Sequence, residues 1–531
     1  MHHHLLLILG LLFAVMLLVM LAKKLKIAYP IFLVIAGILT SLIPGVPDVH
    51  IEPDVIFLIF LPPLLYEAAW YTAWNDFWKL KRPIILLAFG LVFFTSSIIA
   101  YSSTWLIPGF TLAMGFLLGG IVSPPDAVAA GTVMKGLGVP KKIMTILEGE
   151  SLVNDASSLI VVSFALTAVK TGTFSLGTAV GSFFWVAIMG VLVGLVIGFI
   201  MKYIHKYLPT TPAIDAALTW MTPYIMYLVA ESFGFSGVMA TVTGGLFISY
   251  HANTIFQSGE TRVNMLGVWT TVIFVLNALV FVLIGLELPE ILKGLGSVNI
   301  GTGIKYGLII SLLVIVIRFV WVYATSFIQF GKKRSPNRIA GWKESLIISF
   351  SGMRGVVSLA TALSIPFYIS ETNNIYFPQR NLTIFVTFIV IVVTLVGQGL
   401  ILPFIIKMVK LPLDNEANED EQITNIQLKL NTKAMWFLNK KFQKEITDNE
   451  LIGFYFEDLQ HNVNISQQRL DSLECDETTL EEIDQYHQML LEVYSMQRMQ
   501  LFEMRRSNAF SDEALRKVEN QLDLDSSKIN G

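Results

Sequence analysis

Hydrophobic residues lie along most of this chain in long runs that short polar segments separate. A helix needs about 20 mostly apolar residues to cross the hydrocarbon core of a bilayer, and runs close to that length recur as far as Lys410. We therefore predict thirteen membrane-spanning helices, at residues 5–22, 29–44, 54–72, 83–107, 110–134, 140–169, 175–205, 211–233, 236–252, 264–291, 302–328, 341–365 and 381–409. The pattern favours an all-α polytopic membrane protein whose transmembrane domain covers residues 1–410.

The composition agrees with this pattern and adds an orientation. Apolar residues make up 54% of the chain and charged residues only 15%, as expected for a multi-pass membrane protein. Between the predicted spans, 19 Lys and Arg residues fall on one side of the membrane and four on the other. Because positive residues concentrate in cytoplasmic loops, we expect the N-terminus outside and the C-terminal tail in the cytoplasm. The expected location is the plasma membrane, which is the inner membrane of a bacterium.

The two ends of the chain differ from the predicted spans. Met1 to His4 lack the basic region of a cleavable signal sequence, so the first apolar run is expected to remain as a span, and His2–His4 receive no role. Residues 411–531 alternate charged and apolar positions, with 24 acidic against 12 basic residues. They are expected to form about four amphipathic helices that cap the protein or support a dimer; sensing of pH, cations or a partner has no motif behind it. The single Cys475 excludes an intrachain disulfide.

The fifth predicted span contains the stretch GIVSPPDAVAAG. Pro124 and Pro125 lack backbone N–H groups and clash with the preceding turn, so the helix should open between about Gly119 and Asp126. Backbone that is not helical survives at membrane depth only where it is buried in protein or lines an aqueous cavity. The carbonyls of residues 121–123 would then face an ion or a partner. A simple helix kink is the competing interpretation.

The twelfth predicted span is interrupted as well, in SFSGMRGVVSLA, where Gly352 and Gly355 flank Arg354. The two interrupted spans lie seven apart and therefore cross the membrane in opposite directions. This spacing predicts two inverted six-helix repeats joined by the seventh span, with the broken helices crossing at the midplane. Arg354 would compensate the negative carbonyl ends of the broken helices. A snorkelling arginine is the alternative.

The sixth predicted span contains LEGESLVNDASSLIVV, from Leu147 to Val162. A charged side chain near the bilayer centre costs at least ~2.5–3.5 kcal/mol, so carboxyls there usually have a function. If the helix begins near Pro140, Asp155 lies about 22 Å along it, near the midplane. At helical spacing one face carries Glu148, Ser151 and Asp155, and a second face carries Glu150, Asn154 and Ser158.

The first face offers hard oxygen ligands. Ser151 and Asp155 would lie beside Asp126 and the opened carbonyls of the fifth span, and together these groups suit a monovalent cation, because a tight divalent site usually recruits several carboxylates. A carboxyl in the membrane interior also favours its protonated form. Asp155 can therefore exchange a proton for a cation.

The second face needs a positive charge for Glu150. The best candidate is Arg318, which lies within the apolar run IVIRFVWV of the eleventh span, and we predict a structural Glu150–Arg318 ion pair. Pairing of Arg318 with Glu344 or with a lipid headgroup is the alternative. A further acid, Glu67, follows two prolines in FLPPLLYEAAW and either lines the cation route or is a solvated cytoplasmic acid.

Taken together, these motifs resemble the cation/proton antiporters of the sodium/proton exchanger family. The resemblance covers all thirteen spans and rests on LPPLLYEAA, SPPDAVAA, EGESLVNDA, Arg318 and SGMRGVVSLA in that order, of which EGESLVNDA is the most specific. It implies a homodimer in which a core domain moves against a dimerisation domain in an elevator-like cycle. It also implies that Asp155 binds Na⁺, K⁺, Li⁺ or a proton, with Asn154, Ser151, Asp126, the Pro125 carbonyl and Glu67 as the other cation- or proton-binding residues, and that Glu150 pairs with Arg318.

Two features of the motifs refine this expectation. Asn154 stands where the electrogenic branch of the family has a second Asp, which implies electroneutral one-for-one exchange and a role in pH and sodium homeostasis. The break reads Pro125-Asp126-Ala127 where Thr-Asp-Pro is commoner, so a threonine hydroxyl is missing and the cation preference is open.

Two other classes of transporter compete with the antiporter. A cation channel would need a continuous wetted path, often with repeated filter loops, and the sequence has no such loops. A sodium-coupled carrier of an organic acid would bind the substrate carboxylate at a free helix N-terminus. No nucleophile and base, nucleotide-binding, nucleic-acid-binding or cofactor motif appears, so we predict a transporter without a cofactor rather than an enzyme.

Overall fold

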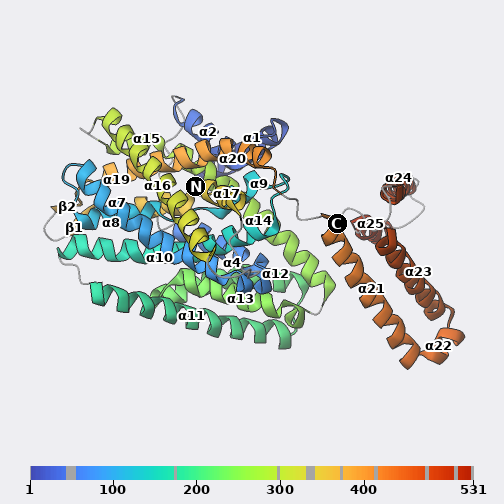
Figure 1. Cartoon of the computed structure of the whole chain (residues 1–531). Helices are drawn as coiled ribbons and strands as arrows, with labels where there is room; N and C mark the ends of the chain where they lie inside the picture. Colours follow the sequence, from blue (N-terminus) through green and yellow to red (C-terminus); the bar gives the residue numbers. More distant parts are fainter. Residues whose placement is uncertain are drawn as a thin grey trace. The chain divides into compact units, whose positions relative to one another are not determined.

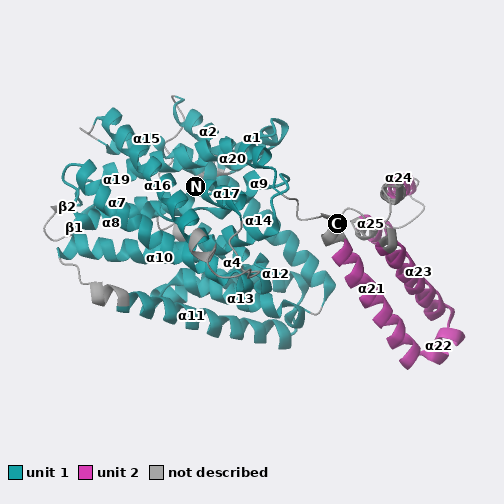
Figure 2. Cartoon of the chain, in the orientation of Figure 1, with its two compact units in different colours: residues 1–413 teal, residues 414–531 magenta. Residues whose placement is uncertain are grey.

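The computed structural model describes residues 2–43, 56–172, 176–256, 258–295, 299–330, 341–370, 375–411, 416–472, 478–506 and 512–527. The chain divides into two compact units, residues 1–413 and residues 414–531 (Figure 2). Cys475 and four of the basic loop residues, Lys332, Lys333, Arg334 and Arg338, lie outside the described residues.

Each predicted span corresponds to helical structure in unit 1 (Figure 1). The first seven are α1 (His2–Lys24), α2 (Tyr29–Ser41), a π-helical turn (Ile56–Phe60) with α4 (Leu61–Tyr71), α6 (Lys81–Ile85) with a π-helical turn (Leu86–Leu91) and α7 (Val92–Leu106), α8 (Leu112–Val122) with α9 (Ala127–Met134), α10 (Lys141–Thr171) and α11 (Leu176–Tyr207). The others are α12 (Pro212–Ser232), α13 (Gly237–Ile255), α14 (Gly259–Leu286), α16 (Ile300–Phe330), α17 (Trp342–Phe350) with α18 (Val356–Leu363), and α19 (Arg380–Val392) with a π-helical turn (Val393–Gln398) and α20 (Gly399–Val409).

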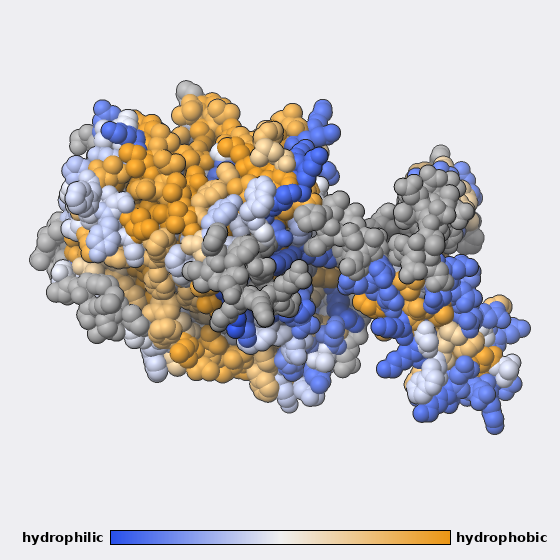
Figure 3. Space-filling view, in the orientation of Figure 1, coloured by the Kyte–Doolittle hydropathy of each residue, from blue (hydrophilic) through white to orange (hydrophobic). Residues whose placement is uncertain are grey.

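Short elements connect some of these spans. They are α5 (Trp74–Lys79), α15 (Leu288–Gly294) and an antiparallel pair of strands, β1 (Tyr368–Ser370) and β2 (Ile375–Tyr376). Within the described residues, eight helical segments are long and apolar enough to cross a membrane by length and composition alone, and α2 is a shorter apolar helix. Hydrophobic residues also dominate much of the surface of unit 1 in Figure 3. The prediction of an all-α multi-pass membrane protein is confirmed.

The helices of unit 1 pack as two bundles. In one bundle α2 packs against α14 and α4 packs against α13. Because each span corresponds to the one seven positions later, the α2–α14 pair maps onto the α13–α4 pair, as an inverted repeat requires. We call this first group, with α11 and α12, the scaffold bundle. The second group, which we call the core bundle, contains α7, α8, α10 and α16–α19.

Small residues allow the closest helix contacts in the scaffold bundle. A Cβ atom on Gly37 of α2 would lie 2.5 Å from the carbonyl oxygen of Val282 on α14, and one on Gly285 would lie 2.5 Å from that of Val34. Gly190, Gly194 and Gly198 repeat every four residues on the face of α11 that meets α13. Small residues at such spacing let backbones approach closely where lipid removes the hydrophobic drive for association.

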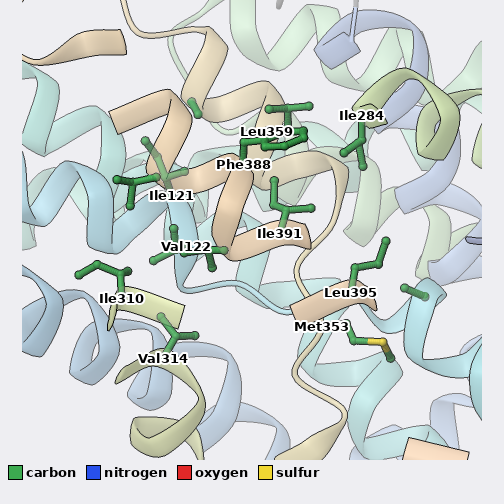
Figure 4. Close-up of a cluster of buried hydrophobic side chains, with 14 of the residues drawn as sticks. Ile121, Val122, Ile284, Ile310, Val314, Met353, Leu359, Phe388, Ile391 and Leu395 are labelled. Carbon is green, nitrogen blue, oxygen red and sulfur yellow. The ribbon is translucent and has the colours of Figure 1, made fainter. Parts of the chain in front are cut away.

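The core bundle packs apolar side chains around the two interrupted helices. The buried apolar side chains of this bundle include Ile121 and Val122 at the end of α8, Ile310 and Val314 of α16, and Met353 in the second interruption (Figure 4). Close packing of this kind fixes the position of backbone that has left the helix.

Unit 2 is helical throughout its described residues. It contains α21 (Glu416–Lys441), α22 (Gln443–Asp448), α23 (Glu450–Ser472), α24 (Thr478–Arg506) and α25 (Asp512–Ser527). α21 packs against α23, and α24 against α25. The prediction of a helical tail is confirmed, with the short α22 in addition to the four longer helices.

Candidate functional site

The first interruption is narrower than predicted. α8 remains helical through Gly119 and Gly120, which pack against Ser96 of α7 and Val162 of α10, and only residues 123–126 leave the helix. The predicted opening between about Gly119 and Asp126 contains the break, which is confined to the last four of those residues because close packing holds the preceding turn in place. Asp126 caps α9: its Oδ1 accepts hydrogen bonds from the N–H groups of Val128, at 2.9 Å, and Ala129, at 3.3 Å.

Arg354, in the second interruption, binds the carboxyl end of α8. Its Nε donates to the carbonyl of Val122 at 2.9 Å, its Nη2 donates to that of Ser123 at 3.2 Å, and its Nη1 donates to that of Gly352. The side chain is 1% exposed. The sequence predicted that the carbonyls of residues 121–123 face an ion or a partner. Those of Val122 and Ser123 bind the guanidinium of Arg354, as expected for groups at the negative end of a helix.

Backbone contacts join the two interruptions directly. The N–H of Asp126 donates to the carbonyl of Met353 at 2.7 Å. A Cβ atom on Gly355 would overlap the Asp126 carboxylate, and one on Gly352 would overlap the side chain of Arg318. Glycine is therefore required at both positions because the side chains of Asp126 and Arg318 occupy the space.

Asp155, Ser151, Asp126 and Pro125 line one cavity of about 70 Å³ between the two interruptions. Asp155 is 7% exposed, and among the described residues its carboxylate makes no hydrogen bond and no ion pair. The Ser151 hydroxyl oxygen accepts from the N–H of Ala127 at 3.4 Å. One carboxylate therefore faces this cavity without a fixed positive partner.

Asn154 faces the first interruption. Its Nδ2 donates to the carbonyl of Pro125 at 3.0 Å, and the side chain is fully buried. In this arrangement Asn154 holds the non-helical backbone in place, and one lone pair of the Pro125 carbonyl is already engaged. Asp155, the next residue on α10, is left to face the cavity.

Glu150 and Arg318 form a bidentate ion pair. Arg318 Nη1 and Nη2 donate to the two carboxylate oxygens of Glu150 at 2.6 and 2.8 Å, and Nε donates to the carbonyl of Ile348 at 3.0 Å. The side chains are 0% and 1% exposed. Glu344, the alternative partner, lies 4.0 Å from Lys142. The pair joins α10, α16 and α17.

Glu67 does not line the cavity that Asp155 faces. It lies partly buried on α4, where Leu61, Leu64, Leu65 and Ala68 provide the wall of that cavity. Its carboxyl is close enough to that of Glu148 for the two to interact electrostatically. Of the candidate cation-binding residues, Asn154 and Glu67 thus do not line the cavity, but Asn154 contacts it through the Pro125 carbonyl.

Two further polar residues line the cavity and were not selected from the sequence. They are Asn277 of α14 and Ser358 of α18, which are 6% and 2% exposed. A signal for Asn277 existed, because it is a lone amide in the apolar run FVLNALVF. Ser358 had no such signal, because serine is common in membrane helices. It differs from other serines of the spans only in lying close to the second interruption.

The chemistry of the cavity suits a small monovalent cation. Its polar side chains are carboxylates, hydroxyls and one amide, all of which offer the oxygen ligands that hard cations prefer. A water needs about 10–15 Å³ of such space, so about 70 Å³ accommodates an ion with a few waters. Among the described residues, no three His, Cys, Asp or Glu side chains gather as a site for a more demanding metal.

Comparison with known proteins gives a consistent result. The sodium/hydrogen exchanger transmembrane family model matches residues 10–408. The chain is 34% identical over 388 residues to a sodium, potassium, lithium and rubidium/H⁺ antiporter of Bacillus pumilus; the match covers 71% of this chain but only 58% of that protein's length. It is 32% identical over 386 residues to the low-affinity Na⁺/H⁺ antiporter NhaS1 of Synechocystis, covering 72% of this chain and 69% of that protein. The sodium proton antiporter MjNhaP1 of Methanocaldococcus jannaschii shares the fold, with a TM-score of 0.53 at 20% identity over 76% of this chain and 97% of that one.

Proposed function

The chain belongs to the sodium/hydrogen exchanger family, and we propose that it exchanges monovalent cations for protons at Asp155. The observation that carries this proposal is a buried carboxylate that has no fixed positive partner among the described residues and faces a cavity between two broken helices. Such a group binds either a proton or a cation. Since occupancy by one excludes the other, a site that crosses the membrane only when it is occupied carries the two ions in opposite directions.

The ligands of the cation are drawn from the cavity wall. Asp155 supplies the charge, and Ser151 and Asp126 supply further oxygens. Na⁺ is the cation that we propose first, with K⁺ and Li⁺ as further substrates. The size of the cavity supports an inorganic ion over an organic acid, because sites for drug-sized ligands measure about 300–1,000 Å³.

The two bundles suggest how access alternates. The broken helices and α10 belong to the core bundle, while α4 and α14 of the scaffold bundle form the opposite wall of the cavity. Sliding of the core bundle against the scaffold bundle, in an elevator-like cycle within a homodimer, would carry Asp155 between the two membrane faces. The distribution of Lys and Arg supports an external N-terminus and a cytoplasmic tail in the plasma membrane.

The stoichiometry follows from Asn154. Asn154 is neutral and donates to Pro125, so Asp155 is the one titratable group of the pair. One proton then exchanges for one monovalent cation, and transport is electroneutral. Such an exchanger serves pH and sodium homeostasis.

Proteoliposomes that contain a pH-sensitive dye test the proposal. An imposed pH gradient should dissipate when Na⁺ is added to the wild type, and the rate should not change when K⁺ with valinomycin sets the membrane voltage. Asp155→Asn should abolish the response, because the amide neither releases a proton nor supplies a charge. Asp76→Asn, which changes an exposed carboxyl on α5, is the control and should behave as the wild type.

Three results would contradict parts of this proposal. An Asp155→Asn variant that still dissipates the gradient would remove the assignment of the site. Cation flux without proton movement would indicate a channel. A rate that follows the imposed voltage would exclude one-for-one exchange.

A further inference from the structure

The wall of the cavity that faces Asp155 carries two polar side chains that hold no other part of the described fold in place. Asn277 belongs to α14 of the scaffold bundle, and Ser358 belongs to α18, just after the second interruption. Both are more than nine-tenths buried. Within the described residues neither side chain has a hydrogen-bond partner, and the Ser358 hydroxyl is fully shielded from solvent.

Leaving such groups without partners costs free energy, because an amide or hydroxyl in an apolar environment loses its hydrogen bonds to water. Apolar side chains fill most of the surroundings, among them Leu61, Phe281 and Val356. Polar residues that are buried, unpartnered and turned toward a common cavity point to a ligand that completes them.

The other walls of the cavity leave coordination positions unfilled. Pro125 has no side-chain hydroxyl, and its carbonyl already accepts from Asn154. The Oδ1 of Asp126 caps α9 through two hydrogen bonds. Asp155, Ser151 and the second carboxylate oxygen of Asp126 together still provide fewer oxygens than the roughly six that a hard cation usually takes from protein and water.

We propose that the side-chain amide oxygen of Asn277 and the hydroxyl of Ser358 are additional ligands of the transported cation and help to set the selectivity of the site. This inference rests on the proposed function, since it extends the same site. With Asp155 and Ser151 on α10, Ser358 on α18 and Asn277 on α14, the cation contacts three helices. Asn277 is the ligand from the scaffold bundle, so the bound cation links the two bundles in this arrangement.

The consequence is a division of roles between charge and selectivity. A proton needs only the carboxylate of Asp155, whereas a cation also needs oxygens at a distance that fits its radius. Loss of Asn277 or Ser358 should therefore weaken cation binding while proton binding at Asp155 persists.

Asn277→Leu and Ser358→Ala test the inference in proteoliposomes with Na⁺, Li⁺ and K⁺. Each should raise the KM for Na⁺ about tenfold, an effect typical of altered metal surroundings, and change the ratio of the KM values for Na⁺ and K⁺, while the rate at saturating Na⁺ stays within about threefold. Asn264→Leu, at an exposed asparagine of the same helix, and Ser364→Ala, just after α18, are the matched controls and should leave the KM unchanged.

A binding measurement on purified protein provides a second readout. Na⁺ should raise the melting temperature of the wild type, because a ligand that binds only the folded state stabilises it, and the shift should be smaller in both variants. Should Asn277→Leu fail to fold, Ser358→Ala, which removes one oxygen, carries the same test. An unchanged KM and melting shift in either variant that folds would overturn the proposal. Failure of the wild type to exchange Na⁺ for protons would instead count against the proposed function, and a melting shift that depends on Asn277 would still support the ligand assignment.

Discussion

Two regions of α10 place a buried carboxylate in different surroundings. Glu150 is fully buried and receives both its hydrogen bonds from Arg318, at 2.6 and 2.8 Å. Asp155 is 7% exposed and has no ion pair among the described residues, and it faces a cavity of about 70 Å³. Five residues separate the two, so they point to different sides of the helix. The Glu150 carboxylate has a permanent partner, whereas the Asp155 carboxylate has space for an ion that binds and dissociates.

The difference shows how one helix combines stability with exchange. Breaking a buried pair leaves a charge uncompensated, so the Glu150 region is fixed. The Asp155 region must change its charge in every cycle and therefore needs neighbours that hold their own positions without it. Asn154 and Arg354 provide this support, because they bind the carbonyls of Pro125, Val122 and Ser123.

The largest effect is expected from breaking the ion pair between Glu150 and Arg318. Arg318→Leu leaves the Glu150 carboxylate buried without its partner, so the free energy of unfolding should fall by about 3–5 kcal/mol. Glu150→Leu combined with Arg318→Leu should recover much of that loss, because no charge remains uncompensated. Thermal unfolding of the purified protein in detergent measures both changes.

A matched control lies in unit 2. Arg498 pairs with Asp523 at 2.7 Å, but both side chains are about half exposed, so Arg498→Leu should cost no more than about 1 kcal/mol. If Arg318→Leu were as mild as this control, the pair would not stabilise the core bundle, and the contrast between the two carboxylates would disappear.

The sequence could predict the features of the fold that depend on local residues. Pro124 and Pro125 reveal one broken helix because proline cannot continue a helix, and Arg318 is evident as a lone charge in an apolar run. The all-α fold and the interrupted spans followed from such local features. The exact extent of the first break did not, because the contacts that keep the turn at Gly119 helical come from α7 and α10, which are far away in the sequence.

Only some residues of the cavity could be predicted from the sequence. Asp155 and Ser151 could be placed on one face from helical spacing, and the structure puts both at the cavity. Asn277 and Ser358 complete the same cavity from α14 and α18, which only tertiary packing brings together. Glu67 was chosen because it is an acid within an apolar span, whereas the structure turns the apolar residues of α4 toward the cavity.

An effect of intermediate size sharpens the description of the exchangeable region. Since a cation binds the charged form of Asp155, cation binding releases one proton, and acidic solution favours the protonated form. In the acidic range the apparent KM for Na⁺ should rise about tenfold for each unit by which the pH falls, because protons compete for Asp155. The rate at saturating Na⁺ should stay nearly constant. Initial rates in proteoliposomes at several pH values measure this dependence. A KM that does not change with pH would mean that the proton and the cation occupy different sites.

The smallest expected effect concerns Glu67, which lies outside both regions. Because its carboxyl does not line the cavity, its remaining influence is to raise the local concentration of cations, an effect that salt screens. Glu67→Gln should therefore raise the KM for Na⁺ only about two- to threefold at low ionic strength, and less when choline chloride is added. Asp76→Asn, at an exposed carboxyl, is the control. A loss of tenfold or more that persists at high salt would instead make Glu67 a ligand, and the cavity around Asp155 would have to extend toward α4 during transport.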